Sequence, residues 1–443
     1  MRDYKYQPFT LHNYNNITQL KNLSDEDLEA IKVVGNVLPF KANNYVVEEL
    51  IDWNNIPDDP IYTLTFPRKK MLSKKNYETV KGLLASDDTE KLRNGVHDIR
   101  MQLNPNPAGQ EFNVPIVDRQ RLHGMQHKYR ETALFFPSQG QTCHAYCTFC
   151  FRWPQFTGMR DLRFAMKDAD LFHKYLLKNK RITDVLFTGG DPMTTRAAVL
   201  EKYIEPLLTK EFSHIRNIRI GSKSLAYWPY RFISDTDSDD ILALFEKVGK
   251  SGKHLAFQAH FNHPVELSTE AVKVATERIN NTGAVIRTQS PLLKNINDDH
   301  KTWSEMWTKQ VELGMIPYYM FIARDTGSKS FFEVPLARSW RIFQKAYSNV
   351  SGICRTVRGP SMSANPGKVQ VLGISEIKGE KVFVLRFLQC RNPNYVDIPF
   401  FAKYDGRATW IDQLIPAFGE EQFFFEKDNL LSSSSEGPDF SWE

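Results

Sequence analysis

Residues 139–153 read QGQTCHAYCTFCFRW. This stretch places Cys143, Cys147 and Cys150 on a polar loop in the spacing Cys-x3-Cys-x2-Cys. Structural zinc usually takes four protein ligands in two spaced pairs, and no second Cys or His pair stands at a suitable spacing here. An iron–sulfur cube held by three thiolates leaves one iron open to bind a small molecule. The spacing therefore favours a cluster with an open coordination position over a closed zinc knuckle or three ordinary buried thiols.

Short apolar runs alternate with amphipathic stretches around and after this loop. The runs predict strands at residues 133–137, 184–191, 217–222, 254–261, 284–290 and 316–322. The stretches between them predict helices at 197–210, 238–252, 268–283 and 300–314. This alternation is typical of βα units and a parallel sheet. We therefore expect an α/β fold, a partial (β/α)6 barrel whose site lies at the carboxyl ends of the strands.

The segments before and after the predicted barrel show other patterns of secondary structure. Helices are expected at 23–40, where Ser24 is a suitable N-cap, and at 72–88 and 89–103. Two alternating runs beyond residue 365 predict a β-hairpin. The predicted organisation is an N-terminal helical region (1–125), the barrel (126–350), a C-terminal β-containing extension (351–430) and a flexible tail (431–443).

Composition bounds the class of protein. The 443 residues carry a net charge of +5 and are 41% hydrophobic, which is too apolar for a disordered chain and too weakly basic to indicate nucleic-acid binding. Five cysteines are too few for a disulfide scaffold, and we expect Cys354 and Cys390 to be structural thiols. The sequence shows no signal peptide or membrane span, which predicts a cytoplasmic protein without a membrane partner.

The cysteine spacing, with Phe149 before the third cysteine, resembles the radical S-adenosylmethionine (SAM) signature. Five later motifs resemble the lysine 2,3-aminomutase family in their order and spacing: LFTGGDP (186–192), RIGSKS (219–224), AHFNHPVELS (259–268), TQSPLLKNIND (288–298) and PYYMF (317–321). The resemblance covers residues 120–390. It implies a [4Fe-4S] cluster on Cys143, Cys147 and Cys150, with SAM on the open iron.

The resemblance also assigns residues around SAM. It implies that the turn after the second predicted strand, Thr188, Gly189, Gly190 and Asp191, contacts the methionine amino group. Ser222, His260 and Gln289 end three successive predicted strands and would contact SAM or a second cofactor. Taken alone, the turn would be a tight strand-to-helix connection, and His260 a hydrogen-bonded core histidine.

The second cofactor that the resemblance implies is pyridoxal 5′-phosphate (PLP). Lys368, in ANPGKVQV, matches the family's imine-forming lysine, although a lysine that opens a strand is usually a solvated edge residue. Lys128 and Arg130 match the segment that holds the PLP phosphate, and Tyr129 would pack on the ring. Where the family carries a second arginine, this chain has Thr132.

Departures from the family bear on the substrate. Arg152 matches the arginine that holds the substrate α-carboxylate, although alone it would suit a surface position. Lysine aminomutases place two aspartates near the substrate ε-ammonium; this chain has Arg324 and Asp325 at the first place, and no carboxylate in GPSMSANPGK (359–368) at the second. An arginine would favour an acidic side chain, as in the glutamate 2,3-aminomutase branch.

The prediction is an amino-acid 2,3-aminomutase, an isomerase that moves the α-amino group of a free amino acid to the β-carbon. The substrate is expected to be acidic rather than lysine, the reductant a flavodoxin- or ferredoxin-type protein, and the assembly a homodimer or homotetramer. Three alternatives stay open: a lysine 2,3-aminomutase proper, a shorter related branch that modifies a protein-bound lysine, and a non-catalytic iron–sulfur or zinc scaffold.

Overall fold

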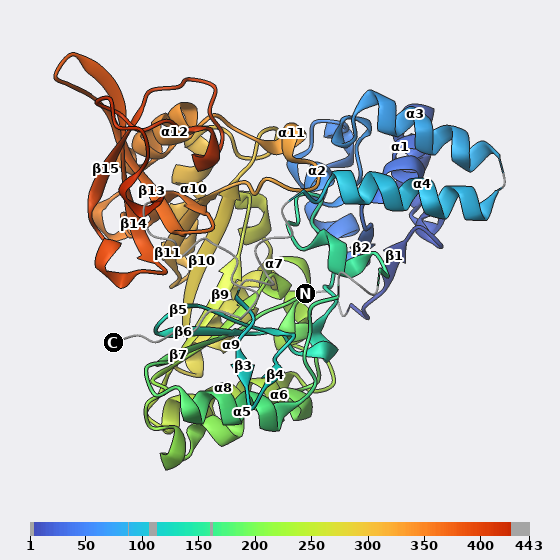
Figure 1. The fold of residues 1–443 in the computed structure, drawn as a ribbon. Coiled ribbons are helices and arrows are strands. Elements are labelled where there is room, and N and C mark those ends of the chain that lie inside the picture. Colours follow the sequence, from blue (N-terminus) through green and yellow to red (C-terminus); the bar gives the residue numbers. More distant parts are fainter. Residues whose placement is uncertain (1–3, 87, 106–112, 160–162, 427–443) are drawn as a thin grey trace.

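A single mixed sheet of eleven strands forms the centre of the molecule (Figure 1). The computed structural model describes residues 4–86, 88–105, 113–159 and 163–426. The sheet order is β15-β14-β13-β12-β11-β10-β9-β8-β7-β6-β5. Its strands are β5 (Met125–Tyr129), β6 (Thr132–Phe135), β7 (Asp184–Phe187), β8 (Asn217–Ser222), β9 (His254–His260), β10 (Val285–Leu292), β11 (Ile316–Ile322), β12 (Arg358–Ser363), β13 (Gly367–Ile377), β14 (Glu380–Cys390) and β15 (Pro399–Lys403).

The sheet is parallel in its middle and antiparallel at both ends. Strands β6 to β12 run parallel to their neighbours, whereas β5 and the strands from β13 onward pair antiparallel. The sheet is curved, as a contact between distant strands shows. Lys128 of the edge strand β5 donates a hydrogen bond to the carbonyl of Ala364, which lies between β12 and β13. The curvature places residues from distant strands across one interior space.

All six predicted strands are present, as β6 to β11. The predicted hairpin is formed by β13 and β14, and it continues the central sheet instead of forming a layer of its own. Strands β5 and β12 were not predicted, because MQHKY is largely polar and RGPSMS contains Gly359 and Pro360, which are poor strand formers. Strand β15 was not predicted either.

Helices cover the sheet and build the N-terminal region (Figure 1). The N-terminal helices are α1 (Asp25–Val37), α2 (Pro60–Thr65), α3 (Lys74–Ala85) and α4 (Thr89–Gln102), beside the short strands β1 (Pro8–Thr10) and β2 (Lys41–Asn43). The Ser24 hydroxyl caps α1 as predicted, since it accepts a hydrogen bond from the amide of Asp27. The helices associated with the sheet are α5 (Ala169–Lys178), α6 (Ala197–Ile204), α7 (Ser224–Tyr227), α8 (Ser238–Lys250), α9 (Glu270–Asn281), α10 (His300–Glu312), α11 (Lys329–Phe332) and α12 (Leu336–Ser348).

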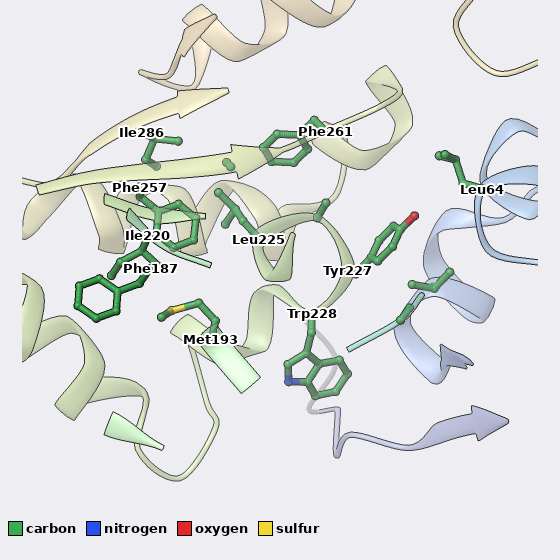
Figure 2. Packing of buried hydrophobic residues seen from close by; sticks show 14 of the residues in the cluster. Leu64, Phe187, Met193, Ile220, Leu225, Tyr227, Trp228, Phe257, Phe261 and Ile286 are labelled. Atoms are coloured by element: carbon green, nitrogen blue, oxygen red, sulfur yellow. The ribbon is translucent and has the colours of Figure 1, made fainter. Parts of the chain in front are cut away.

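The main hydrophobic core is continuous between the sheet and the N-terminal helices. Figure 2 shows Phe187, Ile220 and Phe257 of neighbouring strands within the same buried cluster as Leu64 of α2. A second cluster lies in the C-terminal extension, around Phe387 and Phe400. The N-terminal region is therefore packed onto the sheet, while the predicted tail at 431–443 lies outside the described residues. Among the described residues, no helix is both long and apolar enough to cross a membrane.

Candidate active site

A cavity of about 740 Å³ lies inside the curved sheet, and most of the predicted site residues line it. The three cysteines border it, together with the turn at Thr188–Asp191 that follows β7. Lys368 of β13 and Lys128 of β5 also line it. One cavity therefore joins the predicted cluster, SAM and PLP residues, which come from opposite parts of the sheet.

The N-terminal region holds the cysteine loop in place. The amide of Tyr146 donates to the carbonyl of Lys41 (2.7 Å), and the amide of Thr148 donates to the carbonyl of Leu64 (2.9 Å). The Lys41 ammonium donates to the carbonyl of Cys143 at 2.7 Å. These contacts tie the loop to β2 and α2, so the N-terminal helices position the thiols.

The three thiols line the cavity, and burial raises the pKa of each of them. Within the described residues, no group of three His, Cys, Asp or Glu side chains has the arrangement needed to hold a single metal ion. Thiolates that each bind a different iron of one cluster need not converge on a single point.

The glycines of the turn after β7 serve close backbone packing. A Cβ atom on Gly190 would lie 2.4 Å from the carbonyl oxygen of Thr142 and 2.7 Å from that of Gly140. Gly189 has a φ of +146°, which favours glycine. The amide of Asp191 donates to the carbonyls of both Gly140 and Thr142. The turn is therefore docked on the segment that leads into Cys143.

The Asp191 carboxylate is occupied by protein donors. Its Oδ2 accepts hydrogen bonds from the Ser222 hydroxyl (3.0 Å), the Lys223 amide (2.8 Å) and the Ser224 hydroxyl (3.0 Å). Its Oδ1 accepts from the amide of Met193 at 2.9 Å. Asp191 and Ser222 thus join the ends of β7 and β8, and this carboxylate fixes the shape of the turn.

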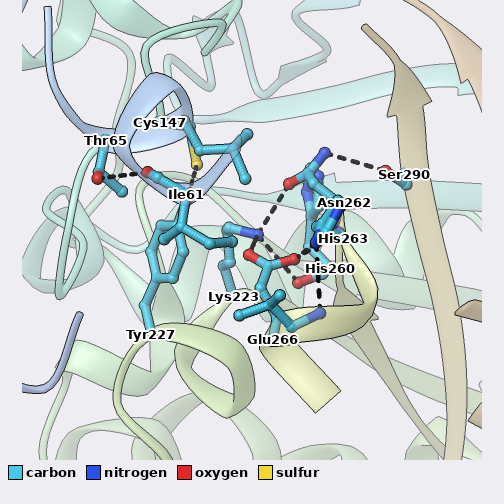
Figure 3. A network of polar contacts seen from close by, with 12 residues as sticks. Ile61, Thr65, Cys147, Lys223, Tyr227, His260, Asn262, His263, Glu266 and Ser290 are labelled. Carbon is cyan, nitrogen blue, oxygen red and sulfur yellow. Dashed lines mark hydrogen bonds and ion pairs between the residues drawn. The ribbon is translucent and has the colours of Figure 1, made fainter. Parts of the chain in front are cut away.

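A polar network lies behind His260 (Figure 3). The ammonium of Lys223 forms a buried ion pair with Glu266 at 2.7 Å and donates to the side chain of Asn262. His260 lines the cavity, and its buried Nε2 has no hydrogen-bond partner among the described residues. Gln289 lies beside His260 in the pairing of β10 with β9. Both side chains stand where the sequence predicts them, at the cavity wall.

Lys368 lies on an aromatic surface inside the cavity. Its Nζ is 4.1 Å from the ring centroid of Tyr319 and 5.5 Å from that of Phe321, both on β11. Burial, followed by the positive charges of Arg219 and Arg358, lowers the pKa of Lys368 to about 7. A neutral amine is the form that attacks an aldehyde, so this environment suits a lysine that bonds a carbonyl cofactor.

The segment predicted to hold a phosphate is only partly in the cavity. Lys128 and Tyr129 line it, and burial lowers the pKa of Lys128 well below its usual range. Arg130 does not: it occupies the turn between β5 and β6, is 40% exposed and pairs with Glu131 at 2.6 Å. The turn directs this side chain away from the interior, so the structure does not bring Arg130 together with Lys128 and Tyr129.

The predicted substrate-binding arginines share one aromatic ring. The guanidinium carbon of Arg152 lies 5.1 Å from the ring centroid of Phe151, and that of Arg324 lies 5.6 Å from it. Arg152 donates to the carbonyl of Gly189 at 2.9 Å. Arg324 donates to the carbonyl of Ser363 at 2.9 Å and faces the ring of Trp410 at 5.6 Å. Both arginines and Asp325 line the cavity, as predicted.

Other residues of the cavity were missed by the sequence interpretation. Arg219 could have been found from the alternation of β8, which turns Arg219 and Gly221 toward the same face of the sheet. The aromatic Tyr319 lies in a recognised motif but was assigned no role. Trp410 carried no local signal, since it follows the last strand by several residues and reaches the cavity only through the fold of the C-terminal extension.

Comparison with known proteins adds a relationship by sequence. A protein of Aquifex aeolicus, provisionally named an L-lysine 2,3-aminomutase, is 31% identical over 394 residues, which cover 89% of this chain and 92% of the relative. The chain belongs to the lysine 2,3-aminomutase family.

Relatives in this family carry two substrate names. The L-lysine 2,3-aminomutase of Methanococcus maripaludis is 22% identical over 97% of this chain and 91% of its own length. The glutamate 2,3-aminomutase of Clostridioides difficile is 24% identical over 79% of this chain and 72% of its own length. No family model matches the chain. A radical SAM methyltransferase from Sphaerobacter thermophilus superposes with a TM-score of 0.37 and 14% identity, over 54% of this chain and 68% of its own.

Membership of the lysine 2,3-aminomutase family implies an enzyme of the isomerase class. The iron–sulfur cluster and SAM are the cofactors that the sequence resemblance implies. The α/β architecture with a large mixed sheet fits a radical SAM fold. The residues present fit these groups, because three thiols and the unpartnered His260 Nε2 face the same cavity.

Proposed function

We propose that this protein is a radical SAM, PLP-dependent 2,3-aminomutase built on an open (β/α)6 barrel, and that it acts on a free amino acid with an acidic side chain. The observation that carries this proposal is the single cavity lined by Cys143, Cys147 and Cys150 and also by Lys368. When bound, the cluster and SAM supply a 5′-deoxyadenosyl radical, and PLP supplies the aldehyde that carries the migrating amino group.

The protein's own residues bind and orient the reacting groups. Lys368 presents an amine whose lowered pKa leaves it largely neutral near pH 8, ready to bond the cofactor's aldehyde. Lys128 is placed to donate to the cofactor's phosphate, whose negative charge would favour the protonated form that burial disfavours, and Tyr129 packs beside the ring. Arg152 is placed to hold the substrate α-carboxylate. It follows Cys150 by two residues and donates a hydrogen bond to the carbonyl of Gly189, in the turn after β7. The enclosing sheet keeps water from the reacting atoms.

Arg324 supports the choice of an acidic substrate. Its Nε is buried, has no hydrogen-bond partner among the described residues, and lies 3.7 Å from Asp325. A buried donor without an acceptor costs free energy, which a ligand carboxylate would recover. The guanidinium groups of Arg152 and Arg324 both lie near the Phe151 ring, at 5.1 Å and 5.6 Å from its centroid, so one ligand with two carboxylates could be offered a cation at each.

A lysine substrate is the second candidate, because several relatives carry that name. An ε-ammonium directed toward Arg324 would meet a like charge with little solvent to screen it, which disfavours binding. A non-catalytic iron–sulfur or zinc scaffold would give the amine of Lys368 no role in the cavity. We further propose that an electron-transfer protein of the flavodoxin or ferredoxin type reduces the cluster.

Exchange of Arg324 tests the substrate assignment. In Arg324→Ala we expect L-glutamate to bind about 10- to 100-fold more weakly, as for loss of a charge-assisted hydrogen bond, with PLP uptake unchanged. Calorimetric titration of L-glutamate and L-lysine into PLP-loaded protein measures this. Arg407→Ala, which removes an exposed arginine of the same extension (96% exposed), is the matched control. Unchanged glutamate affinity in Arg324→Ala would refute the acidic-substrate assignment.

A further inference from the structure

Arg219 is a partly buried cation of the cavity wall that the proposed function leaves without a role. It lies on β8 with a side chain 19% exposed, and it lines the cavity together with Gln126, Leu134 and Leu186. The pairing of β5 to β8 puts these four residues in one row across the sheet. Arg219 therefore faces the same interior space as Lys128, although β6 and β7 separate β8 from β5 in the sheet.

The neighbours of Arg219 leave part of its guanidinium available. Its Nε donates to Asp184 at 2.8 Å, and its Nη2 contacts the other oxygen of Asp184 at 2.5 Å. Its Nη1 has a long contact of 3.5 Å to Gln258. The Asp184 carboxylate also accepts a hydrogen bond from the Thr132 hydroxyl. Asp184 thus holds the guanidinium in a fixed orientation while Nη1 keeps donor capacity toward the cavity.

Arg219 is also close to Lys368, although the two strands are far apart in the sheet order. The positive charge of Arg219 is the largest electrostatic cause, after burial, of the lowered pKa of Lys368. Lys128 faces the same cavity and donates a hydrogen bond to the carbonyl of Ala364, four residues before Lys368. In PLP the aldehyde and the phosphate-bearing arm occupy adjacent ring carbons. A phosphate bound to this cofactor must therefore lie near the lysine that bonds the aldehyde.

We propose that Arg219 of β8, together with Lys128 of β5, binds the phosphate of PLP at the end of the cavity away from the cysteines. The guanidinium comes from β8, which lies two strands from β6 in the sheet. It supplies a second positive charge to the phosphate site, where Arg130 is absent from the cavity. Arg219 is thus a cofactor-binding residue, and this assignment rests on the proposed PLP dependence.

The test compares PLP with pyridoxal, the same aldehyde without the phosphate. Protein freed of PLP is titrated with each compound, uptake is followed by absorbance, and the bound adduct is fixed by borohydride and counted by mass spectrometry. Arg219→Met should reduce the preference for PLP over pyridoxal by about 10- to 100-fold, as for loss of a charged donor. Arg219→Lys, which keeps a point charge, should lose less.

Arg358→Met is the matched control. Arg358 also lowers the pKa of Lys368, yet it is exposed, lies against the ring of Tyr318 at 5.0 Å and does not line the cavity. Its loss should leave the preference for PLP over pyridoxal unchanged. If Arg219 had a purely structural role, Arg219→Met would weaken the binding of PLP and of pyridoxal equally.

Retention of the wild-type preference in Arg219→Met, or an equal loss in Arg358→Met, overturns the assignment of Arg219. If Arg219→Met does not fold, Arg219→Lys decides, since an unchanged preference there together with unchanged thermal stability shows that the phosphate does not use the Arg219 guanidinium and overturns the assignment. Wild-type protein that takes up neither compound at Lys368 would instead refute the PLP dependence itself.

Discussion

At the scale of single residues, the cavity derives its chemistry from charges placed where water has little access. Lys368 is the clearest case: it lies on Tyr319 and Phe321, and two arginines face it. In water its ammonium would be the stable form, but burial and like charges favour the neutral amine. The amine that we propose to bond the cofactor is therefore activated by its surroundings before any ligand arrives.

The pH dependence of PLP attachment follows from this. With a pKa of about 7, about a tenth of the Lys368 amine is neutral at pH 6 and about nine-tenths at pH 8, so the attachment rate should rise through this interval and level off above it. Stopped-flow absorbance measures the rate, and Lys368→Ala provides the blank. A rate that keeps rising tenfold per pH unit beyond pH 8 would indicate an ordinary lysine and contradict this prediction.

At the scale of elements, the cysteine loop depends on packing as much as on its own sequence. The turn at Thr188–Asp191 sits on the backbone of Gly140 and Thr142, with no space for a side chain between them. The same loop is tied on its other side to Lys41 and Leu64. Strand β7 and the N-terminal region thus hold the loop from two directions.

Gly190→Ala tests this packing. The added methyl would lie 2.4–2.7 Å from backbone atoms of Thr142 and Gly140, which cannot move without shifting the loop. We expect a loss of about 1–3 kcal/mol in unfolding free energy, typical of overpacking, and reduced iron content after anaerobic reconstitution. Urea unfolding and iron analysis measure these.

Gly82→Ala in α3 is the control, because nothing lies within 4 Å of its Cβ position. This change should stabilise the helix by about 0.5–1 kcal/mol and leave iron content unchanged. Wild-type stability together with full iron content in Gly190→Ala would show that the turn does not need its glycine.

At the scale of the whole molecule, the sequence predicted the local elements well and the contacts between residues distant in the chain poorly. The six parallel strands and the hairpin follow from periodicity, and the cysteines from their spacing. The contact between Lys128 and Ala364 depends on the curvature of the entire sheet, which no local pattern contains. Trp410 reaches the cavity for the same kind of reason.

The phosphate site shows the same division. Sequence resemblance predicted that Arg130 binds the phosphate. Arg130 lies in the turn between β5 and β6, and this turn points its side chain outward. The cation that faces the cavity, Arg219, comes from another strand, and its position depends on the register of β5 through β8. The motif indicated a segment of which Lys128 and Tyr129 line the cavity, while register and curvature decided which side chains enter it.

The central claim is that the whole cavity performs a 2,3-amino migration on an acidic amino acid. The most direct measurement is anaerobic incubation of the reconstituted protein with dithionite, SAM, PLP and an equimolar mixture of L-glutamate, L-aspartate, L-alanine and L-lysine, followed by mass spectrometry of the β-amino acids. We predict that β-glutamate is the main product and that it is absent with Lys368→Ala. Preferential formation of β-lysine, or no rearranged amino acid from any of the four, would contradict the claim.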